Sequence, residues 1–218
     1  MGNLEMHIAS CSIPNDSALA RFRDSGEHTH AEAAEVAIPD HRRIDARELA
    51  RLTMDRPSLT PDRAFWLVDL WIRVQGVVMR PFGVKPNTMR SKREQPLPRV
   101  GERLGPYEVF EASEREVLLG DMDKLLEHRM SFIVADGKAY IGVVLRTRNK
   151  AGDAYWAQFR HNQTDILHWS LRRGMSRALG IDDEPAATGT PTAPAAPAAP
   201  AAPPASAAPA VGEATEGR

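Results

Sequence analysis

Apolar and polar residues alternate along the middle of the chain as they do in half-buried β-strands. In residues 126–135, one side carries Leu126, His128, Met130, Phe132 and Val134. The other side carries Glu127, Arg129 and Ser131, so the period is two residues. The same reasoning predicts further strands over residues 107–112, 116–120 and 139–148. Short connections, including Asp136-Gly137, make these strands antiparallel neighbours that share one apolar face.

A helical period replaces the alternation in residues 152–179. On a helical wheel, one arc holds Tyr155, Trp156, Phe159, Ile166, Leu167, Trp169 and Leu171. Gln163, Ser170 and Gly174 interrupt the middle of this arc, where a packed core would place methyl groups. We expect one amphipathic helix of roughly seven turns, laid across the strands with this uneven stripe facing them.

The segment before these strands carries signals for one strand and two helices. Residues 33–38 predict a short strand that a proline ends. Asp45 and Glu48 form a capping box, which predicts a short helix beginning there. Thr60-Pro61 predicts the start of a second helix, which we expect to run to about Arg80. Its apolar stripe consists of Ala64, Leu67, Val68, Trp71, Val74 and Val78.

This order of elements predicts an α+β domain. A strand and two helices come first, then a run of antiparallel strands, then the long amphipathic helix. A curved antiparallel sheet packed on a long C-terminal helix is the helix-grip fold, also called START or Bet v 1-like. We expect that fold, with the helices covering the apolar face of the strands.

Composition divides the chain of 218 residues into three parts. Residues 1–28 mix small, polar and charged types without a period, so we expect a disordered leader. Residues 29–180 have the size of a single domain with one core. From residue 184 to residue 218, Pro and Ala dominate in Ala-Ala-Pro repeats, which predicts a disordered tail.

Charge and composition exclude several classes of protein. The net charge is −1, which gives no support for nucleic-acid binding. The most apolar stretch, residues 64–84, contains charged residues and Pro81, so we expect no transmembrane segment. One cysteine and no signal peptide fit a cytoplasmic protein. The basic excess in residues 80–103 predicts a solvated loop, with an anionic ligand or partner as the alternative.

Cofactor and metal motifs are missing from the sequence, and we expect no cofactor and no metal. It contains no glycine-rich phosphate loop after a strand, no Ser-His-Asp elbow, no Cys-His pair and no zinc spacing. We expect surface positions for the histidine pairs His28/His30 and His161/His168, and a turn at Asp121 and Asp123.

An ordered set of short segments resembles a bacterial family catalogued as domain of unknown function 2867. The segments are Ala31-Glu32-Ala33-Ala34-Glu35-Val36 with Pro39, Ala46-Arg47-Glu48-Leu49-Ala50, Gly101-Glu102-Arg103-Leu104-Gly105-Pro106-Tyr107-Glu108-Val109, Val117-Leu118-Leu119-Gly120 with Asp123, Arg129-Met130-Ser131, and Asn149-Lys150-Ala151-Gly152 with Ala154-Tyr155. The resemblance covers residues 31–179. It implies a helix-grip-like fold and brings no established activity. In some members of that family, the domain is fused behind a nucleotide-cofactor reductase domain, which suggests a role in small-molecule metabolism. The chain departs from the family where Ala34 and His128 replace aromatic residues, and at His161-Asn162-Gln163.

In a helix-grip domain a ligand would lie between the apolar sheet face and the helix stripe. The residues that we expect around it are His128, Met130, Phe132, Trp156, Phe159, Gln163 and Ser170. His128 is the candidate general base, although a core histidine bonded to a neighbour is the alternative. Gln163 is of interest because a buried amide needs partners.

Three functions remain open at this point. The first is binding of a small apolar or amphipathic molecule in the sheet–helix cavity. The second is a cyclase- or hydrolase-like enzyme that uses His128. The third is a non-catalytic interaction module with a filled core, whose protein partner the sequence does not indicate.

Overall fold

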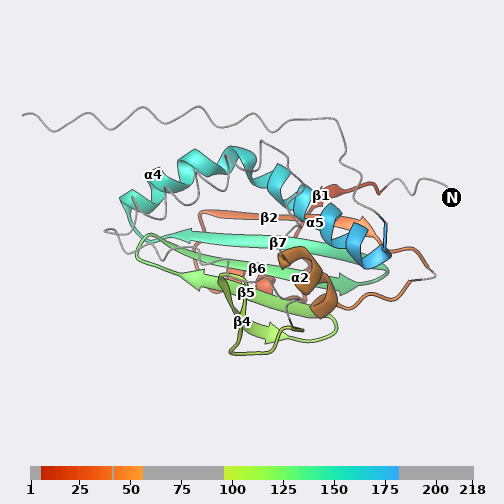
Figure 1. Ribbon diagram of the computed structural model, residues 1–218. Coiled ribbons are helices and arrows are strands. Elements are labelled where there is room, and N and C mark those ends of the chain that lie inside the picture. Colours follow the sequence, from red (N-terminus) through yellow and green to blue (C-terminus); the bar gives the residue numbers. More distant parts are fainter. Residues whose placement is uncertain (1–5, 41, 56–95, 182–218) are drawn as a thin grey trace, which may run out of the picture. The chain divides into compact units, whose positions relative to one another are not determined.

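The computed structural model describes residues 6–40, 42–55 and 96–181 (Figure 1). The strands are β1 Ala9–Cys11, β2 His30–Ala37, β3 Arg103–Leu104, β4 Tyr107–Ala112, β5 Glu116–Met122, β6 Leu126–Ala135 and β7 Lys138–Thr147. The helices are α1 Ala18–Asp24, α2 Ala46–Met54, α4 Lys150–Phe159, the 3₁₀ turn η2 Arg160–Asn162 and α5 Gln163–Leu179. The expected helix 61–80, most of the basic loop and the tail lie outside the described residues.

The strands form one seven-stranded antiparallel sheet in the order β1-β2-β7-β6-β5-β4-β3. The alternating segments predicted the consecutive hairpins from β4 to β7, which are confirmed with small changes in their ends. Asp136 and Gly137 have φ values of 51° and 71°, as a tight two-residue hairpin turn requires. With helices packed on this sheet, the domain has an α+β fold.

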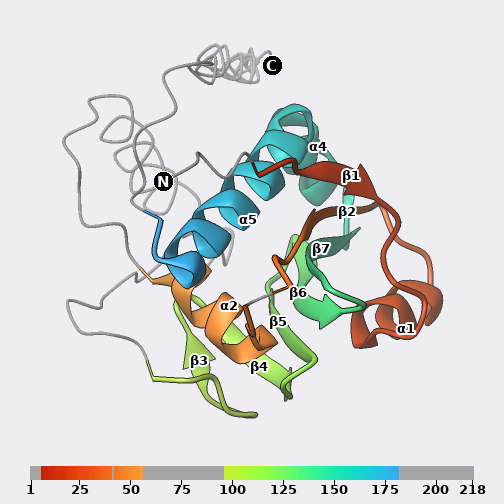
Figure 2. The same cartoon turned by 90° about the vertical axis from the view of Figure 1, so that its right-hand side faces the viewer.

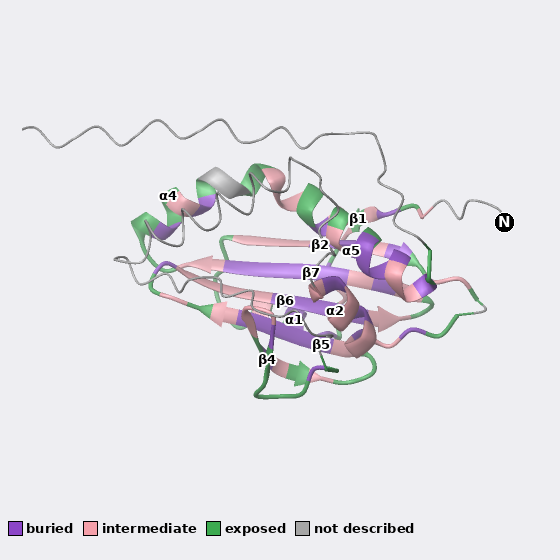
Figure 3. Cartoon of the chain, in the orientation of Figure 1, coloured by how far each residue is buried: buried purple, intermediate pink, exposed green. Residues whose placement is uncertain are grey.

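One face of the sheet is covered by α2 and α5, which Figures 1 and 2 show side by side. Its core contains Leu49, Val117, Leu119, Phe132, Ile141, Leu171 and Met175, all fully buried. Asp45 caps α2 as expected, since its Oδ1 accepts a hydrogen bond from the Glu48 amide at 2.8 Å. At the other end of α2, Arg177 of α5 donates to the carbonyl of Leu52 at 2.9 Å. Gly174 allows the two helices to approach closely, because a Cβ there would lie 2.0 Å from Oγ1 of Thr53 in α2. Figure 3 shows that buried residues run along β5, β7 and α5.

The opposite face is covered by α1, in a segment where we expected no ordered structure. Residues 9–11 pair with β2 as an edge strand, and α1 buries Leu19 against Leu118 and Val144. The anchor is Glu116 of β5, whose carboxylate accepts hydrogen bonds from the amides of Ala18 (2.7 Å) and Leu19 (3.2 Å). The expectation of disorder is therefore wrong for this part of residues 1–28. A seven-residue helix gives little periodic signal, and its stability comes from a distant strand.

The expected single helix 152–179 is interrupted. Helix α4 begins after Asn149, which caps it, and ends at the 3₁₀ turn η2, after which α5 continues. Each 3₁₀ residue advances about 120° instead of about 100°, so η2 shifts the helical phase. Ile166 and Trp169, which the wheel placed toward the sheet, are 49% and 44% exposed. Met175, which the wheel omitted, is fully buried.

Candidate functional site

Polar and aromatic side chains form a row across the face that carries α2, α4 and α5. Paired residues of antiparallel strands point to the same side of a sheet. The register pairs His30 with Leu145, Leu145 with His128, and His128 with Asp121. Tyr107 comes next, one position beyond the Glu108–Gly120 pair, and its ring centroid lies 5.4 Å from that of His128. We call these five residues the polar row.

Helix α4 is placed beside one end of the polar row. It begins where Gly152 packs against the carbonyl of Leu125 in the β5–β6 connection, so closely that a Cβ would lie 2.3 Å from that oxygen. One turn later, the ring of Trp156 lies 4.9 Å from that of His30. Trp156 is 9% exposed. The position of α4 therefore depends on a glycine at its start and an aromatic contact with the row.

Burial shifts the pKa of His128, Tyr107 and Tyr155 toward their neutral forms. Burial lowers the pKa of His128 to about 4, Arg129 lowers it as well, and Asp121 acts in the opposite direction. Burial raises the pKa of Tyr107, and Asp121 and Tyr155 raise it further. Burial and then the charge of Asp123 raise the pKa of Tyr155. At neutral pH the site thus presents an uncharged imidazole and uncharged phenols.

Two polar groups in the row are left without hydrogen-bond partners by the described part of the chain. These are the ring nitrogens of His128 and the hydroxyl of Tyr107, and both residues are half-buried. His30 differs, because its Nε2 lies 3.2 Å from Oε2 of Glu32. A half-buried donor or acceptor without a partner requires water or a ligand to satisfy it.

The residues that the sequence indicated fall into separate groups. His128 belongs to the polar row, and Trp156 contacts the same row through His30. Met130 and Phe132 continue along β6 into the core, where Phe132 is fully buried. Gln163 and Ser170 are half-buried on α5. The side chain of Phe159 lies outside the described ones.

Sequence reasoning missed Tyr107, Tyr155 and His30 as site residues. His30 was expected at the surface beside His28, but it stacks on Trp156 instead. Asp121 was assigned to a turn and lies in the row, whereas Asp123 does make the turn, accepting hydrogen bonds from the amides of Leu125 and Leu126. The signal that could have found the row is the two-residue turn Asp136-Gly137, because it fixes the register that pairs His128 with Leu145.

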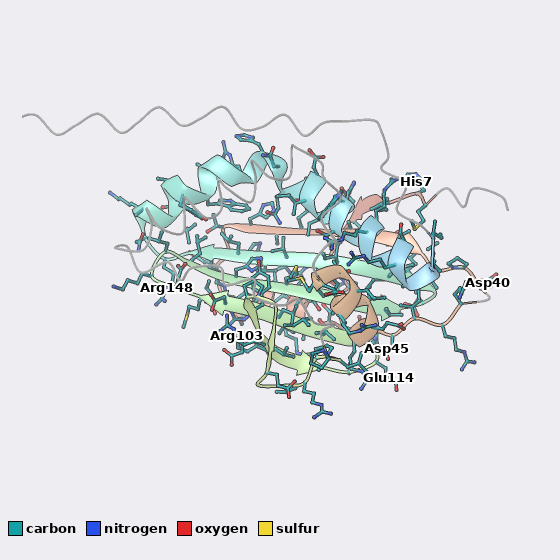
Figure 4. All side chains as sticks on the ribbon, viewed as in Figure 1. His7, Asp40, Asp45, Arg103, Glu114 and Arg148 are labelled. Carbon is teal, nitrogen blue, oxygen red and sulfur yellow. The ribbon has the colours of Figure 1, made fainter. Side chains whose placement is uncertain are left out.

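A recess lies at the far end of β6 and β7, away from the polar row. This recess of about 860 Å³ is bordered by the loop 38–45 and the turns 114–115 and 134–137. Figure 4 shows Asp40, Asp45 and Glu114 at this end, and Arg148 at the end where β7 leaves the sheet. Charges of both signs line the recess, including Arg42, Arg43 and Arg115, so it indicates no particular ligand.

Over 6–40, 42–55 and 96–181, no cluster of His, Cys, Asp and Glu has the arrangement of a metal site. Within the same ranges, no helix has the length and apolarity to cross a bilayer.

The fold and the row define an α+β domain whose antiparallel sheet carries helices on both faces and a partly desolvated polar row on one of them. The family model described as "Protein of unknown function (DUF2867)" matches residues 25–161. Because this match covers more than half of the chain, the protein belongs to that family, and the resemblance seen in the sequence is confirmed. No curated protein and no solved structure matches the chain.

Proposed function

We propose that this domain binds a small amphipathic molecule on the polar row beside α4, in a helix-grip architecture. The observation that carries this proposal is the pair of half-buried polar rings, His128 and Tyr107, whose centroids lie 5.4 Å apart beside the apolar core. A ligand that hydrogen-bonds to these rings and covers apolar side chains beside them would gain from both contacts.

The apolar part of such a molecule has neighbours on both sides of the row. Leu145 lies within the row, and Met130, which is 9% exposed, lies two residues along β6 from His128 at the border of the core. Trp156 adds an aromatic surface from α4. A ligand lying along this surface would place its polar end at His128 and its apolar end against these side chains.

The ligand is placed beside α4 because the space between α5 and the sheet is filled with side chains. Leu171 and Met175 of α5 are fully buried in the same core as Phe132 and Ile141. Well-packed interiors of this kind hold few voids larger than a water molecule. We therefore retain the binding of an amphipathic ligand that the sequence suggested, but we place that ligand further along the sheet, beside α4.

The test uses neutral probes, 1-octanol and 3-phenylpropanol, with the full chain. We expect at least one of them to raise the melting temperature in a concentration-dependent way, since binding to the folded state stabilises it. Tyr107→Phe and His128→Leu should each weaken that binding about 3- to 10-fold, because each removes one hydrogen bond to the ligand.

The matched control is Tyr140→Phe. Tyr140 is also a half-buried strand tyrosine, but it alternates with Ile141 and so points to the other side of the sheet. Its replacement should leave probe affinity unchanged. Equal losses in Tyr140→Phe and Tyr107→Phe, or no melting shift with either probe, would contradict the proposal.

A further inference from the structure

Two acid–base side chains lie together at the β2 end of the polar row. His30 and Glu32 are two residues apart on one strand, so both point to the face that carries the row. Nε2 of His30 lies 3.2 Å from Oε2 of Glu32, and the two side chains are only 24% and 17% exposed. A carboxylate has acceptor atoms only, so Nε2 donates in this contact, and the neutral ring of His30 keeps its lone pair on Nδ1.

The ring of His30 also packs against Trp156 of α4. The two ring centroids lie 4.9 Å apart, the rings are tilted by 48°, and Trp156 is 9% exposed. A histidine that is oriented by a carboxylate and held by a packed neighbour has the arrangement of a general base. Because the side chain of His30 is still 24% exposed, a water molecule can reach it from the solvent.

His128 is suited to the complementary role of a hydrogen-bond donor. Burial lowers its pKa to about 4, so His128 is a poor base near neutral pH. Its neutral ring still carries one N–H group, and the ring centroid of Tyr107 lies 5.4 Å away. The N–H group and the tyrosine hydroxyl can both donate to a carbonyl oxygen, and to the negative charge that develops on that oxygen when the carbonyl is attacked.

The spacing of the strands fits a carbonyl group between the base and the donors. The register places His30 on β2 and His128 on β6, with Leu145 of β7 between them. Two strand spacings separate the Cα atoms of the two histidines by about 10 Å. A water molecule on His30 that attacks a carbonyl bonded to His128 needs a similar span, because each hydrogen bond takes about 2.8 Å and the attack distance is about 3 Å.

We infer that the polar row hydrolyses carboxylic esters with an apolar chain, using His30 as the general base and Glu32 as its positioning residue. This inference rests on the proposed function, because the ester occupies the same site. His30 takes a proton from water, and the oxygen of that water forms a bond to the carbonyl carbon. His128 and Tyr107 stabilise the tetrahedral oxyanion. When the bond from that carbon to the alcohol oxygen breaks, the leaving oxygen takes the proton from His30, and the products are a carboxylic acid and an alcohol.

The experiment measures the release of phenol from phenyl hexanoate by the full chain at pH 7.5. We expect His30→Ala to lower kcat about 100-fold or more, since general-base catalysis contributes about 10²–10⁴-fold. Imidazole added to His30→Ala should restore part of the lost rate, which a purely structural role for His30 does not predict. Glu32→Gln should lower kcat about 10-fold or more and change KM less than about twofold, because the amide does not stabilise the imidazolium.

The matched control is His168→Ala. His168 is also half-buried, and its Nε2 lies 3.1 Å from Oγ of Ser10, so this histidine has a hydroxyl partner in place of a carboxylate. It lies on α5, outside the polar row, and its replacement should leave kcat unchanged. Glu32→Gln is nearly isosteric, so it decides the question if His30→Ala does not fold, and an unchanged kcat in Glu32→Gln overturns the inference.

The outcomes separate the hydrolysis from the proposed function. If 1-octanol or 3-phenylpropanol binds to the row but phenyl hexanoate is not hydrolysed, the hydrolysis is overturned and the binding site stands. Equal losses of kcat in His168→Ala and His30→Ala, or no rescue by imidazole, also overturn the role of His30. If neither alcohol binds and the ester is not hydrolysed, both proposals fail together.

Discussion

Gly174 provides a direct test of how α5 packs on α2. A Cβ at this position would lie 2.0 Å from Oγ1 of Thr53 and 3.2 Å from Cδ1 of Leu49. In an open helix, Gly→Ala stabilises by about 1 kcal/mol, because glycine has the lower helix propensity. Here the new methyl group must displace a buried side chain, and overpacking costs about 1–3 kcal/mol. After the gain in helix propensity is subtracted, we expect Gly174→Ala to lower the free energy of unfolding by up to about 2 kcal/mol.

Thr53 provides the matched partner for a double-mutant cycle. Its hydroxyl is buried, and it has no hydrogen-bond partner within the part of the chain that the structure describes. Thr53→Ala alone should therefore change stability little, and it removes the oxygen that the new methyl group would meet. In the double variant, the Gly174→Ala penalty should fall by about 1–2 kcal/mol.

The assay is urea unfolding of the four proteins in the cycle, followed by circular dichroism. A stabilising Gly174→Ala substitution would refute the close approach of the helices. So would a coupling free energy near zero, since it would mean that Thr53 and Gly174 do not touch.

Two further predictions concern α1 and His128. Glu116→Ala should lower the free energy of unfolding by about 1–2 kcal/mol and speed hydrogen exchange in α1. The reason is that the Glu116 carboxylate accepts hydrogen bonds from the Ala18 amide at 2.7 Å and from the Ser131 hydroxyl at 2.7 Å. Unchanged hydrogen exchange in α1 would contradict this. For His128, burial lowers the folded-state pKa from 6.5 to about 4, so between these pH values the unfolded chain binds more protons. The part of the free energy of unfolding that comes from neutral His128 should be fully present above about pH 6.5. It should decline as the pH falls toward 4, by about 1–3 kcal/mol in total. His128→Gln should flatten the decline, and an equally steep pH profile in that variant would argue against the desolvated site.

Much of the sheet and one helix could be predicted from the sequence. Alternation in β6 specifies which side chains face the core, because the period of a strand is two residues. The Asp136-Gly137 pair supplies the positive φ values of a tight turn, and Asp45 with Glu48 marks the start of α2. These features depend on residues that are close together in the sequence.

The features that were missed depend on distant residues. Helix α1 is anchored by Glu116, which lies 98 residues from Ala18, and nothing near α1 in the sequence indicates that bond. The change of phase at η2 is invisible to a wheel that assumes a constant 100° per residue. The polar row brings together β2, β4, β5, β6 and β7, so it emerges only once the register of each pair is known.

The central claim is that the polar row beside α4 is the binding site. Its most direct test is to map chemical-shift changes in the full chain while 1-octanol or 3-phenylpropanol, whichever binds more tightly, is added. We predict that the largest changes fall on His30, Tyr107, His128, Tyr155 and Trp156. Changes concentrated instead around the exposed Ile166 and Trp169 of α5, or around the recess at residues 38–45, would contradict the account.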